Sequence, residues 1–266
     1  MLVDGKTIAA DIYRELKEEL SGRTKRPRLL VVTAAPNVET QKYLNLKCRF
    51  AEELGIEVVV QEFSSEVTTQ DIQDFLVGAF ATYDGVIIQL PLPVQVDTAL
   101  LLSLLPKQLD IDVANYVATE AEILPPVVGA IKEISKRHQI DFVGKKVVVV
   151  GRGRLVGKPA ALWAEAQSAA VTVVDKDTVD ASTILKEADI IISGAGVPGL
   201  ITPEQIKEGV AIFDASTSEE GGVLRGDADP ACAEKCSVFT PVPGGIGPVT
   251  VAVLLRNLVQ LTKPSS

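Results

Sequence analysis

The sequence has only three cysteines, no long apolar run and no excess of basic residues. Cys48, Cys232 and Cys236 are too few and too unevenly placed for a disulfide framework. Because Cys232 and Cys236 lack a second cluster of ligands, we expect no metal site. No apolar run reaches the about 18 residues of a membrane helix, and the N-terminus is charged rather than apolar like a signal peptide. We therefore expect a soluble, cytoplasmic protein.

The formal net charge is −9. Binding to nucleic acid or to an acidic membrane surface requires a basic face, so we expect neither partner. Any anion must then be bound by a local group of residues. The hydrophobic content of 47% over 266 residues can fill one large core or two modest ones.

Helix-period and strand-like segments alternate along the chain, which predicts an α/β fold with parallel sheets and crossover helices. In the first half, an apolar stripe at helical spacing covers residues 8–20. Buried strands are expected at 28–34, 56–63 and 85–90, and helices at 39–54 and near 69–81.

The second half repeats the alternation in the rhythm of a dinucleotide-binding fold. Strands are expected at 145–151, 171–175, 188–196 and 210–216, with helices from about 157 and near 181–187. The join between the halves falls within 110–127, where Pro125 and Pro126 follow a stretch without clear period. We therefore expect domains at 1–118 and 119–247, with the apolar C-terminal helix at 248–262 packing back on the first.

A glycine-rich turn runs from Gly151 and Arg152 through Gly153 to Gly157, directly after a strand and before a helix. Glycines in this position let the backbone approach a pyrophosphate at the helix N-terminus. The turn therefore indicates a dinucleotide site, and a plain tight turn is the alternative interpretation.

The next strand ends at Asp175, 24 residues after Gly151, close to where an acidic side chain binds the ribose hydroxyls of NAD. This carboxylate favours NAD because it would repel the 2′-phosphate of NADP. Lys176 and Arg152 could neutralise that phosphate, so NADP stays open, as does a turn-capping role for Asp175.

Three further segments occur in order with GRGRLVGKPAA (151–161): TQKYLNLKCRFAEELGI (40–56), DGVIIQLPLP (84–93) and TPVPGGIGPVT (240–250). Together they resemble the bifunctional methylenetetrahydrofolate dehydrogenase/methenyltetrahydrofolate cyclohydrolase family, or FolD family, over nearly the whole chain. The resemblance implies two α/β domains with a cleft between them, a homodimer, NADP or less often NAD as cofactor, and tetrahydrofolate one-carbon derivatives as substrates. The implied reactions are oxidation of 5,10-methylenetetrahydrofolate to 5,10-methenyltetrahydrofolate and hydrolysis of that product to 10-formyltetrahydrofolate.

By this resemblance, Lys47 is the acid/base group of the hydrolysis, Tyr43 lines the pterin site and Gln89 orients the lysine. Tyr43 and Lys47 are four apart on a predicted helix, so their side chains share one face. A lysine exchanges protons near neutral pH only where burial or a nearby cation weakens its hold on the proton, and Lys42 is a candidate cation. Taken singly, the three are better explained as a solvated lysine, a half-buried tyrosine and a strand-end amide. Their occurrence together, in the order of the family, favours the functional roles.

The resemblance further implies that Asp112 binds the amino and ring N–H groups of the pteridine, which one carboxylate can accept as a pair. Asp110 is a competing candidate for this role, and a loop-end aspartate without function is a third interpretation.

Two loops complete the implied substrate site. Pro243, Gly244 and Gly245 belong to a loop that flanks folate and nicotinamide in the family, where glycine removes the Cβ obstacle and proline fixes the turn. A purely structural hinge is the alternative. Leu90 and Pro91, from the QLPLP string, are the remaining candidate substrate-binding residues.

The sequence departs from the family pattern mainly on the cofactor side. The stretch 113–128 is several residues shorter than usual and lacks the family's glycine, histidine and cysteine. Asp175 and Lys176 replace a His-Ser pair, and the usual Val-Gly-Ile is changed at 215–217, which leaves Thr217 as a candidate cofactor-binding residue. Alternatives are therefore a cyclohydrolase with weak or lost dehydrogenase activity, or a non-catalytic folate- or dinucleotide-binding regulator.

Overall fold

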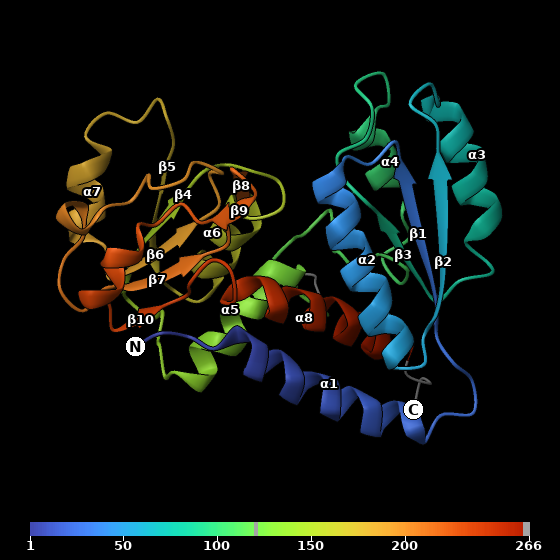
Figure 1. The fold of residues 1–266 in the computed structure, drawn as a ribbon, viewed down its shortest axis with the longest axis horizontal. Coiled ribbons are helices and arrows are strands. Elements are labelled where there is room, and N and C mark those ends of the chain that lie inside the picture. Colours follow the sequence, from blue (N-terminus) through green and yellow to red (C-terminus); the bar gives the residue numbers. More distant parts are fainter. Residues whose placement is uncertain (120–121, 263–266) are drawn as a thin grey trace. The chain divides into compact units, whose positions relative to one another are not determined.

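The structure, a computed structural model, describes residues 1–119 and 122–262, apart from the side chains of Glu39 and Glu220. Helices and strands alternate along it, and both larger sheets are parallel (Figure 1), which confirms the predicted α/β class. The helices are α1 (Gly5–Ser21), α2 (Val38–Glu53), α3 (Thr69–Ala79), α4 (Thr98–Leu104), α5 (Pro126–Arg137), α6 (Gly157–Ala166), α7 (Ala181–Glu187) and α8 (Ile246–Leu261). The strands are β1 (Arg28–Ala34), β2 (Glu57–Phe63), β3 (Gly85–Ile88), β4 (Lys146–Val150), β5 (Ala170–Val174), β6 (Ile190–Ser193), β7 (Ala211–Asp214), β8 (Ser218–Glu220), β9 (Val223–Arg225) and β10 (Val238–Phe239). Short 3-10 helices cover Pro203–Gln205 and Pro230–Glu234.

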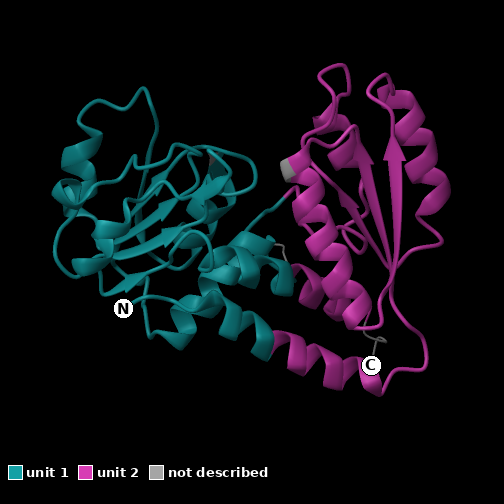
Figure 2. Ribbon diagram, in the orientation of Figure 1, with its two compact units in different colours: residues 1–11, 116–253 teal, residues 12–115, 254–266 magenta. Residues whose placement is uncertain are grey.

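The chain divides into two compact units, drawn in different colours in Figure 2. Unit 1 comprises residues 1–11 and 116–253, and unit 2 comprises residues 12–115 and 254–266. The division falls within α1 and within α8, so each unit is built from two separate stretches of chain.

Unit 2 contains a three-stranded parallel sheet in the order β2-β1-β3. Leu30 of β1 pairs with Val59 of β2 and with Val86 of β3. On one face of this sheet, a core cluster joins Leu30 and Val86 to Leu76 of α3 and Leu101 of α4. Because β1 and β3 are apolar and almost wholly buried, they have the continuous hydrophobic character of strands covered on both faces.

Local capping determines where the helices of unit 2 begin and end. The Asn37 side chain accepts a hydrogen bond from the backbone N–H of Thr40 at 2.8 Å and starts α2. Thr68 and Asp71 form a capping box at the start of α3. Gly55 follows α2 with a φ of +78°, a left-handed conformation that glycine adopts without strain. α2 is therefore fixed at both ends, which sets the direction of every side chain along it.

Unit 1 contains a five-stranded parallel sheet in the order β10-β7-β6-β4-β5. The chain passes from β4 to β5 on one side and then adds β6 on the other side of β4. Such a reversal of strand order is the switch point of a doubly wound sheet, where ligands bind outside the carboxyl ends of the strands. Gly151 follows β4 at that edge, and Gly194 follows β6.

Several elements differ from the sequence predictions. α5 begins at Pro126, inside the stretch expected to be irregular, because proline suits the first helical position, where no N–H partner is needed. The short helix α4 and the β8–β9 hairpin were not predicted. α8 begins at Ile246, two positions before the expected start at 248, and its first turn accommodates Pro248.

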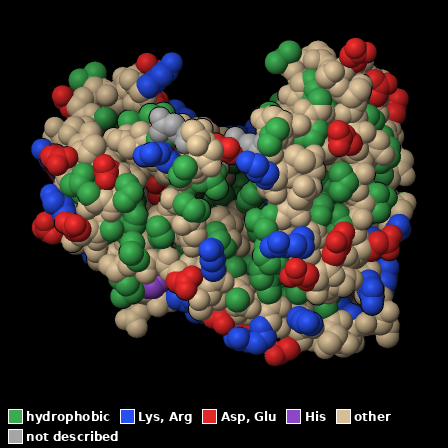
Figure 3. Space-filling model, in the orientation of Figure 1, with side chains coloured by type: hydrophobic (Ala, Val, Ile, Leu, Met, Phe, Trp, Pro, Cys, Tyr) green, Lys and Arg blue, Asp and Glu red, His purple; other side chains and the backbone are tan. Residues whose placement is uncertain are grey.

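Within the described ranges, no helix is long and apolar enough to span a membrane. The same residues contain no group of three or more His, Cys, Asp and Glu arranged to hold a metal ion. On the face drawn in Figure 3, Lys and Arg side chains are interspersed with Asp and Glu.

Candidate functional site

Lys47 is a buried cation of unit 2. It lies on α2, its exposed fraction is only 8%, and its Nζ donates a hydrogen bond to Oε1 of Gln89 at 3.1 Å. Burying an ammonium is costly unless the group is hydrogen-bonded, so this bond gives Lys47 a definite position. The structure thus brings together the two residues that the sequence analysis named as a pair.

Gln89 is held so that its oxygen faces the lysine. It directly follows β3, and its backbone N–H donates to the Val32 carbonyl of β1 at 2.8 Å. Its side-chain Nε2 donates to the Leu90 carbonyl at 2.8 Å. Because the amide nitrogen is engaged there, the amide oxygen is left to accept from Lys47.

Tyr43 lies one helical turn before Lys47, and the Lys47 Nζ is 4.9 Å from the centre of its ring. That distance is a cation–π contact, which stabilises the ammonium without neutralising it. Burial, followed by the negative charge of Asp112, raises the pKa of Tyr43, so its phenol stays protonated. The phenol is therefore a neutral hydrogen-bond donor beside the amine.

Asp110 and Asp112 play different parts in the structure. Asp110 is 7% exposed, its Oδ2 accepts from the backbone N–H of Ala114 at 2.8 Å, and burial and the Asp112 charge raise its pKa to about 6. Asp112 is half-buried; burial raises its pKa, and the Lys47 ammonium acts in the opposite direction. Asp110 thus shapes the loop, whereas Asp112 is the carboxylate electrostatically coupled to Lys47 and Tyr43.

Thr33 is a polar residue of unit 2 that the sequence analysis missed. Its side chain is 0% exposed, and its hydroxyl has no hydrogen-bond partner among the described residues. Side chains alternate along a strand, so Thr33 faces away from the cluster that contains Leu30 and Val32. A single hydroxyl in the apolar run 28–34 breaks the expected composition of a buried strand, and that break was its only signal.

The glycine-rich turn of unit 1 has a shape that only glycine allows. Gly151 follows β4 with a φ of +99°, and a Cβ on Gly157 would lie 2.1 Å from the Gly151 carbonyl oxygen. The Gly153 carbonyl accepts from the backbone N–H of Lys158 at 3.0 Å, in the first turn of α6. The absent Cβ atoms leave a cradle at a helix N-terminus, which fits a pyrophosphate.

Gly194, which follows β6, is a second position where two backbone segments come close at the carboxyl ends of the strands. The sequence analysis missed it. A Cβ on Gly194 would lie 2.5 Å from Cβ of Val156, within the glycine-rich turn. The Gly194 carbonyl oxygen is 3.0 Å from the position of a Cβ on Gly151. A glycine directly after a strand is a detectable signal, but only sheet order shows that β6 adjoins β4.

The residues predicted to bear on the choice of dinucleotide lie after β5 and β7. The Asp175 carboxylate accepts from Arg152 Nε and from Thr178 Oγ1, and these bonds lower its pKa. Asp175 is therefore ionised near neutral pH and suits ribose hydroxyl donors. Lys176 is exposed next to it, and Thr217 is exposed in the loop after β7.

The structure places the two loops predicted to border the substrate, at residues 243–245 in unit 1 and 90–91 in unit 2, as follows. Gly244 has a φ of +106° and accepts at its carbonyl from the backbone N–H of Gly5 at 2.9 Å. A Cβ on Gly245 would lie 2.7 Å from the Pro241 carbonyl oxygen, so this position also requires glycine. Pro243 is exposed. In unit 2, Leu90 packs against the core cluster and Pro91 is exposed.

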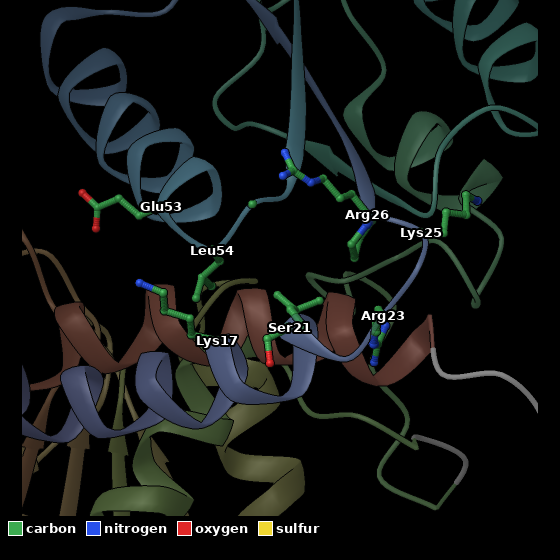
Figure 4. A pocket seen from close by; sticks show the side chains of 10 residues that line it. Lys17, Ser21, Arg23, Lys25, Arg26, Glu53 and Leu54 are labelled. Carbon is green, nitrogen blue, oxygen red and sulfur yellow. The ribbon is translucent and has the colours of Figure 1, made fainter.

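A hollow of about 360 Å³ lies in unit 2, where α1 and α2 end (Figure 4). The hollow adjoins the amino end of β1, whereas Gln89 follows the carboxyl end of β3. Because β1 and β3 are parallel, the hollow and Gln89 lie at opposite ends of the strands. Arg23, in its lining, donates to the Val259 carbonyl of α8 at 2.8 Å. Cations offset the partial negative charge of helix carboxyl ends, which explains the basic lining. That lining contains the cations Lys17, Arg23, Lys25 and Arg26.

Comparison with known proteins gives a consistent result. The model for the catalytic domain of tetrahydrofolate dehydrogenase/cyclohydrolase matches residues 3–112, and the model for its NAD(P)-binding domain matches residues 117–266. The bifunctional protein FolD of Halothermothrix orenii is 34% identical over 98% of both chains. The structure of FolD from Campylobacter jejuni matches with a TM-score of 0.93 and 32% identity over 98% of both chains. The FolD structure from Trypanosoma brucei, complexed with NADP and an inhibitor, has a TM-score of 0.90 and 30% identity, covering 98% of this chain and 96% of that one. These matches confirm the resemblance drawn from the sequence: the chain belongs to the tetrahydrofolate dehydrogenase/cyclohydrolase family.

Proposed function

We propose that this protein oxidises 5,10-methylenetetrahydrofolate with NAD or NADP and hydrolyses the methenyl product to 10-formyltetrahydrofolate. The observation that carries the proposal is the hydrogen bond from the buried Lys47 Nζ to Gln89, with the Tyr43 ring against the same amine. Membership of the family and the glycine cradle of unit 1 support it further.

In the hydrolysis, Lys47 is the group that moves protons. Water adds its oxygen to the methenyl carbon, the bond from that carbon to the ring nitrogen N5 breaks, and N5 keeps the electron pair and takes a proton. One water is consumed and one proton is released overall. The bond to Gln89 fixes the Lys47 Nζ, so the amine can pass a proton between water and substrate without first reorienting.

Tyr43 and Asp112 bind the substrate in this proposal. The protonated Tyr43 phenol packs against the pterin ring and donates a hydrogen bond. The Asp112 carboxylate accepts from the amino and ring N–H groups, and Asp110 holds the loop that carries it. Leu90 and Pro91 border the same site.

The cofactor is bound by unit 1. When bound, the nicotinamide dinucleotide supplies the redox chemistry by accepting the hydride. Gly151, Arg152, Gly153 and Gly157 border the pyrophosphate, and Asp175 accepts from the ribose hydroxyls. We propose a preference for NAD, because the ionised Asp175 opposes a 2′-phosphate, although Arg152 and Lys176 offer charges of the opposite sign.

We further propose remaining contacts around the cofactor and the folate. Thr217, in the exposed loop after β7, contributes to the dinucleotide site, while Pro243, Gly244 and Gly245 flank the folate and the nicotinamide. The basis is the position of both loops after the carboxyl ends of strands in the same sheet, which is where doubly wound folds bind ligands.

We also propose a cytoplasmic homodimer. β2 is an edge strand of its sheet, and Val60 on it is 43% exposed. An uncovered edge offers backbone groups for pairing with a second chain. Light scattering of the purified protein tests this, and a monomer at micromolar concentration would contradict it.

A monofunctional cyclohydrolase is the second candidate. It is favoured by the shortened stretch 113–128, which lacks family residues on the cofactor side, while Lys47, Gln89 and Tyr43 are all kept. Purified protein given 5,10-methylenetetrahydrofolate with NAD or NADP separates the two, with reduced cofactor and formyl product recorded independently. We expect both products. Formyl product from the methenyl substrate, with no reduced cofactor, would establish the second candidate, and no turnover of either substrate would refute both.

A further inference from the structure

Asp227 is a fully buried carboxylate in unit 1 that the proposed chemistry does not use. It accepts three hydrogen bonds: from Ser193 Oγ at 2.5 Å, from the Ala195 backbone N–H at 2.7 Å and from the Val197 backbone N–H at 2.7 Å. Bonds to an ionised acceptor are roughly twice as strong as neutral ones. One side chain therefore fixes the whole loop that follows β6.

This loop, residues 194–197, borders the glycine-rich turn. Gly194 lies against Val156 and Gly151, at the switch point between β4 and β6. Any shift of the loop would therefore change one wall of the dinucleotide cradle.

The hydrogen bonds to Asp227 also determine which backbone groups the 194–197 loop presents to the dinucleotide site. The N–H groups of Ala195 and Val197 turn inward to the carboxylate, so they cannot bind a phosphate. In the described part of the chain, no hydrogen bond reaches the carbonyl oxygens of Gly194 and Ala195. The loop thus offers acceptors, which suit the ribose hydroxyls and the carboxamide NH₂ of a nicotinamide nucleoside.

We propose that Asp227 is a positioning residue for the dinucleotide, setting the 194–197 loop so that its carbonyls receive the ribose and nicotinamide half. This inference rests on the proposed cofactor site. It assigns no contact between Asp227 and the ligand, because the carboxylate acts through the loop.

The test compares two ligands in one variant, Asp227→Asn. The amide places an N–H₂ group against N–H and O–H donors, so the loop loses at least one of its three anchors. We expect the dissociation constant of the reduced dinucleotide that the wild type prefers to rise about tenfold. The dissociation constant of the matching adenosine fragment, ADP or its 2′-phosphate, should change less than about twofold, because the fragment lacks the nicotinamide half.

Two further variants complete the experiment. Asp229→Asn makes the same change two positions later, at a side chain that caps the 3-10 helix at 230–234, and it should leave both dissociation constants unchanged. Ser193→Ala removes only one of the three bonds, and it should weaken dinucleotide binding by a smaller factor than Asp227→Asn. If Asp227→Asn does not fold, Ser193→Ala carries the test, and unchanged dinucleotide binding in it overturns the inference.

The outcomes separate this inference from the proposed function. Equal weakening of dinucleotide and fragment would show a general structural role and overturn the inference, as would no weakening of either. A wild type that binds no dinucleotide refutes the cofactor site and this inference with it. A wild type that binds dinucleotide but turns over no folate refutes the proposed function and leaves the binding test intact.

Discussion

The proposed sites of the two units consist of different chemical groups: side chains in unit 2 and backbone in unit 1. In unit 2 the site consists of side chains, because Lys47 on α2, Gln89 after β3 and Asp112 in a loop come from separate segments. In unit 1 the cradle consists of backbone, and its defining property is the absence of Cβ atoms at Gly151 and Gly157. A side-chain site is lost by removing a functional group, whereas a backbone site is lost by adding an atom. Substitutions should therefore separate the two functions.

The two units also differ in where their charged groups lie. The Lys47 ammonium is buried and lies against a neutral amide and an aromatic ring. Arg152 and Asp175 form an ion pair at the surface, where solvent screens the interaction. The charged groups thus differ in their surroundings: a buried amine in unit 2 and a solvent-exposed ion pair in unit 1.

Lys47→Met should give the largest effect. It removes the proton-transfer group and keeps most of the buried stem, so we expect hydrolysis of methenyltetrahydrofolate to fall about 10²- to 10⁴-fold with the fold intact. Enzyme-dependent hydrolysis, after subtraction of the uncatalysed rate, measures this. Lys17→Met is the matched control, because Lys17 is an exposed lysine of the same unit, at the hollow. Full activity of Lys47→Met would remove Lys47 from the mechanism.

Gly157→Ala should give the next largest effect, in unit 1. The added Cβ would lie 2.1 Å from the Gly151 carbonyl oxygen, so the turn must move. We expect the dissociation constant for dinucleotide to rise about 10- to 100-fold, measured by calorimetry. Gly78→Ala is the control, because a Cβ on Gly78 meets nothing within 4 Å and alanine favours the helix. Unchanged dinucleotide binding in Gly157→Ala would place the cofactor elsewhere.

Gln89 variants should sharpen the comparison within unit 2. Gln89→Leu removes the oxygen that accepts from Lys47, and we expect hydrolysis to fall about tenfold or more, because the amine loses its orientation. Gln89→Glu adds a negative charge that holds the proton on the amine, so its activity should recover as pH rises. The pH–rate profiles of the two variants test this; identical profiles would show that Gln89 does not act on the amine.

Asp110→Asn should act on stability rather than on rate. Burial, with the Asp112 charge, raises the pKa of Asp110 from 3.8 to about 6, so the folded state holds this proton more tightly than the unfolded chain. The stability that this proton contributes is complete below about pH 4 and is lost by about pH 6, a change of at most about 3 kcal/mol. Urea unfolding across that range should show a smaller loss in Asp110→Asn than in the wild type. Equal losses would contradict the assignment.

Most of the fold could be predicted because local periodicity and burial agree. The expected strand at 28–34 and helix at 181–187 match β1 and α7 residue for residue. α5 was missed because Pro125 and Pro126 suggested a turn, although Val128, Ile131 and Ile134 are buried at helical spacing.

The candidate sites were predictable to different degrees, because a local sequence pattern reports only contacts between residues that are close in the sequence. Tyr43 and Lys47 share a helix, so their spacing alone predicts that both side chains lie on one face. Asp227 is bonded to residues about 30 positions earlier, and no local pattern reports such a contact. Gly194 belongs with Gly151 only because β6 adjoins β4, which is a property of sheet order.

The most direct test of the account measures two quantities in the same two variants: the rate of methenyltetrahydrofolate hydrolysis without dinucleotide, and the dissociation constant for dinucleotide. We expect each variant to lose one of these two properties and keep the other. Lys47→Met should lose hydrolysis and bind dinucleotide like the wild type, whereas Gly157→Ala should lose binding and keep hydrolysis. Loss of both properties in both variants would contradict the claim that hydrolysis depends on the buried amine and dinucleotide binding on a separate backbone cradle.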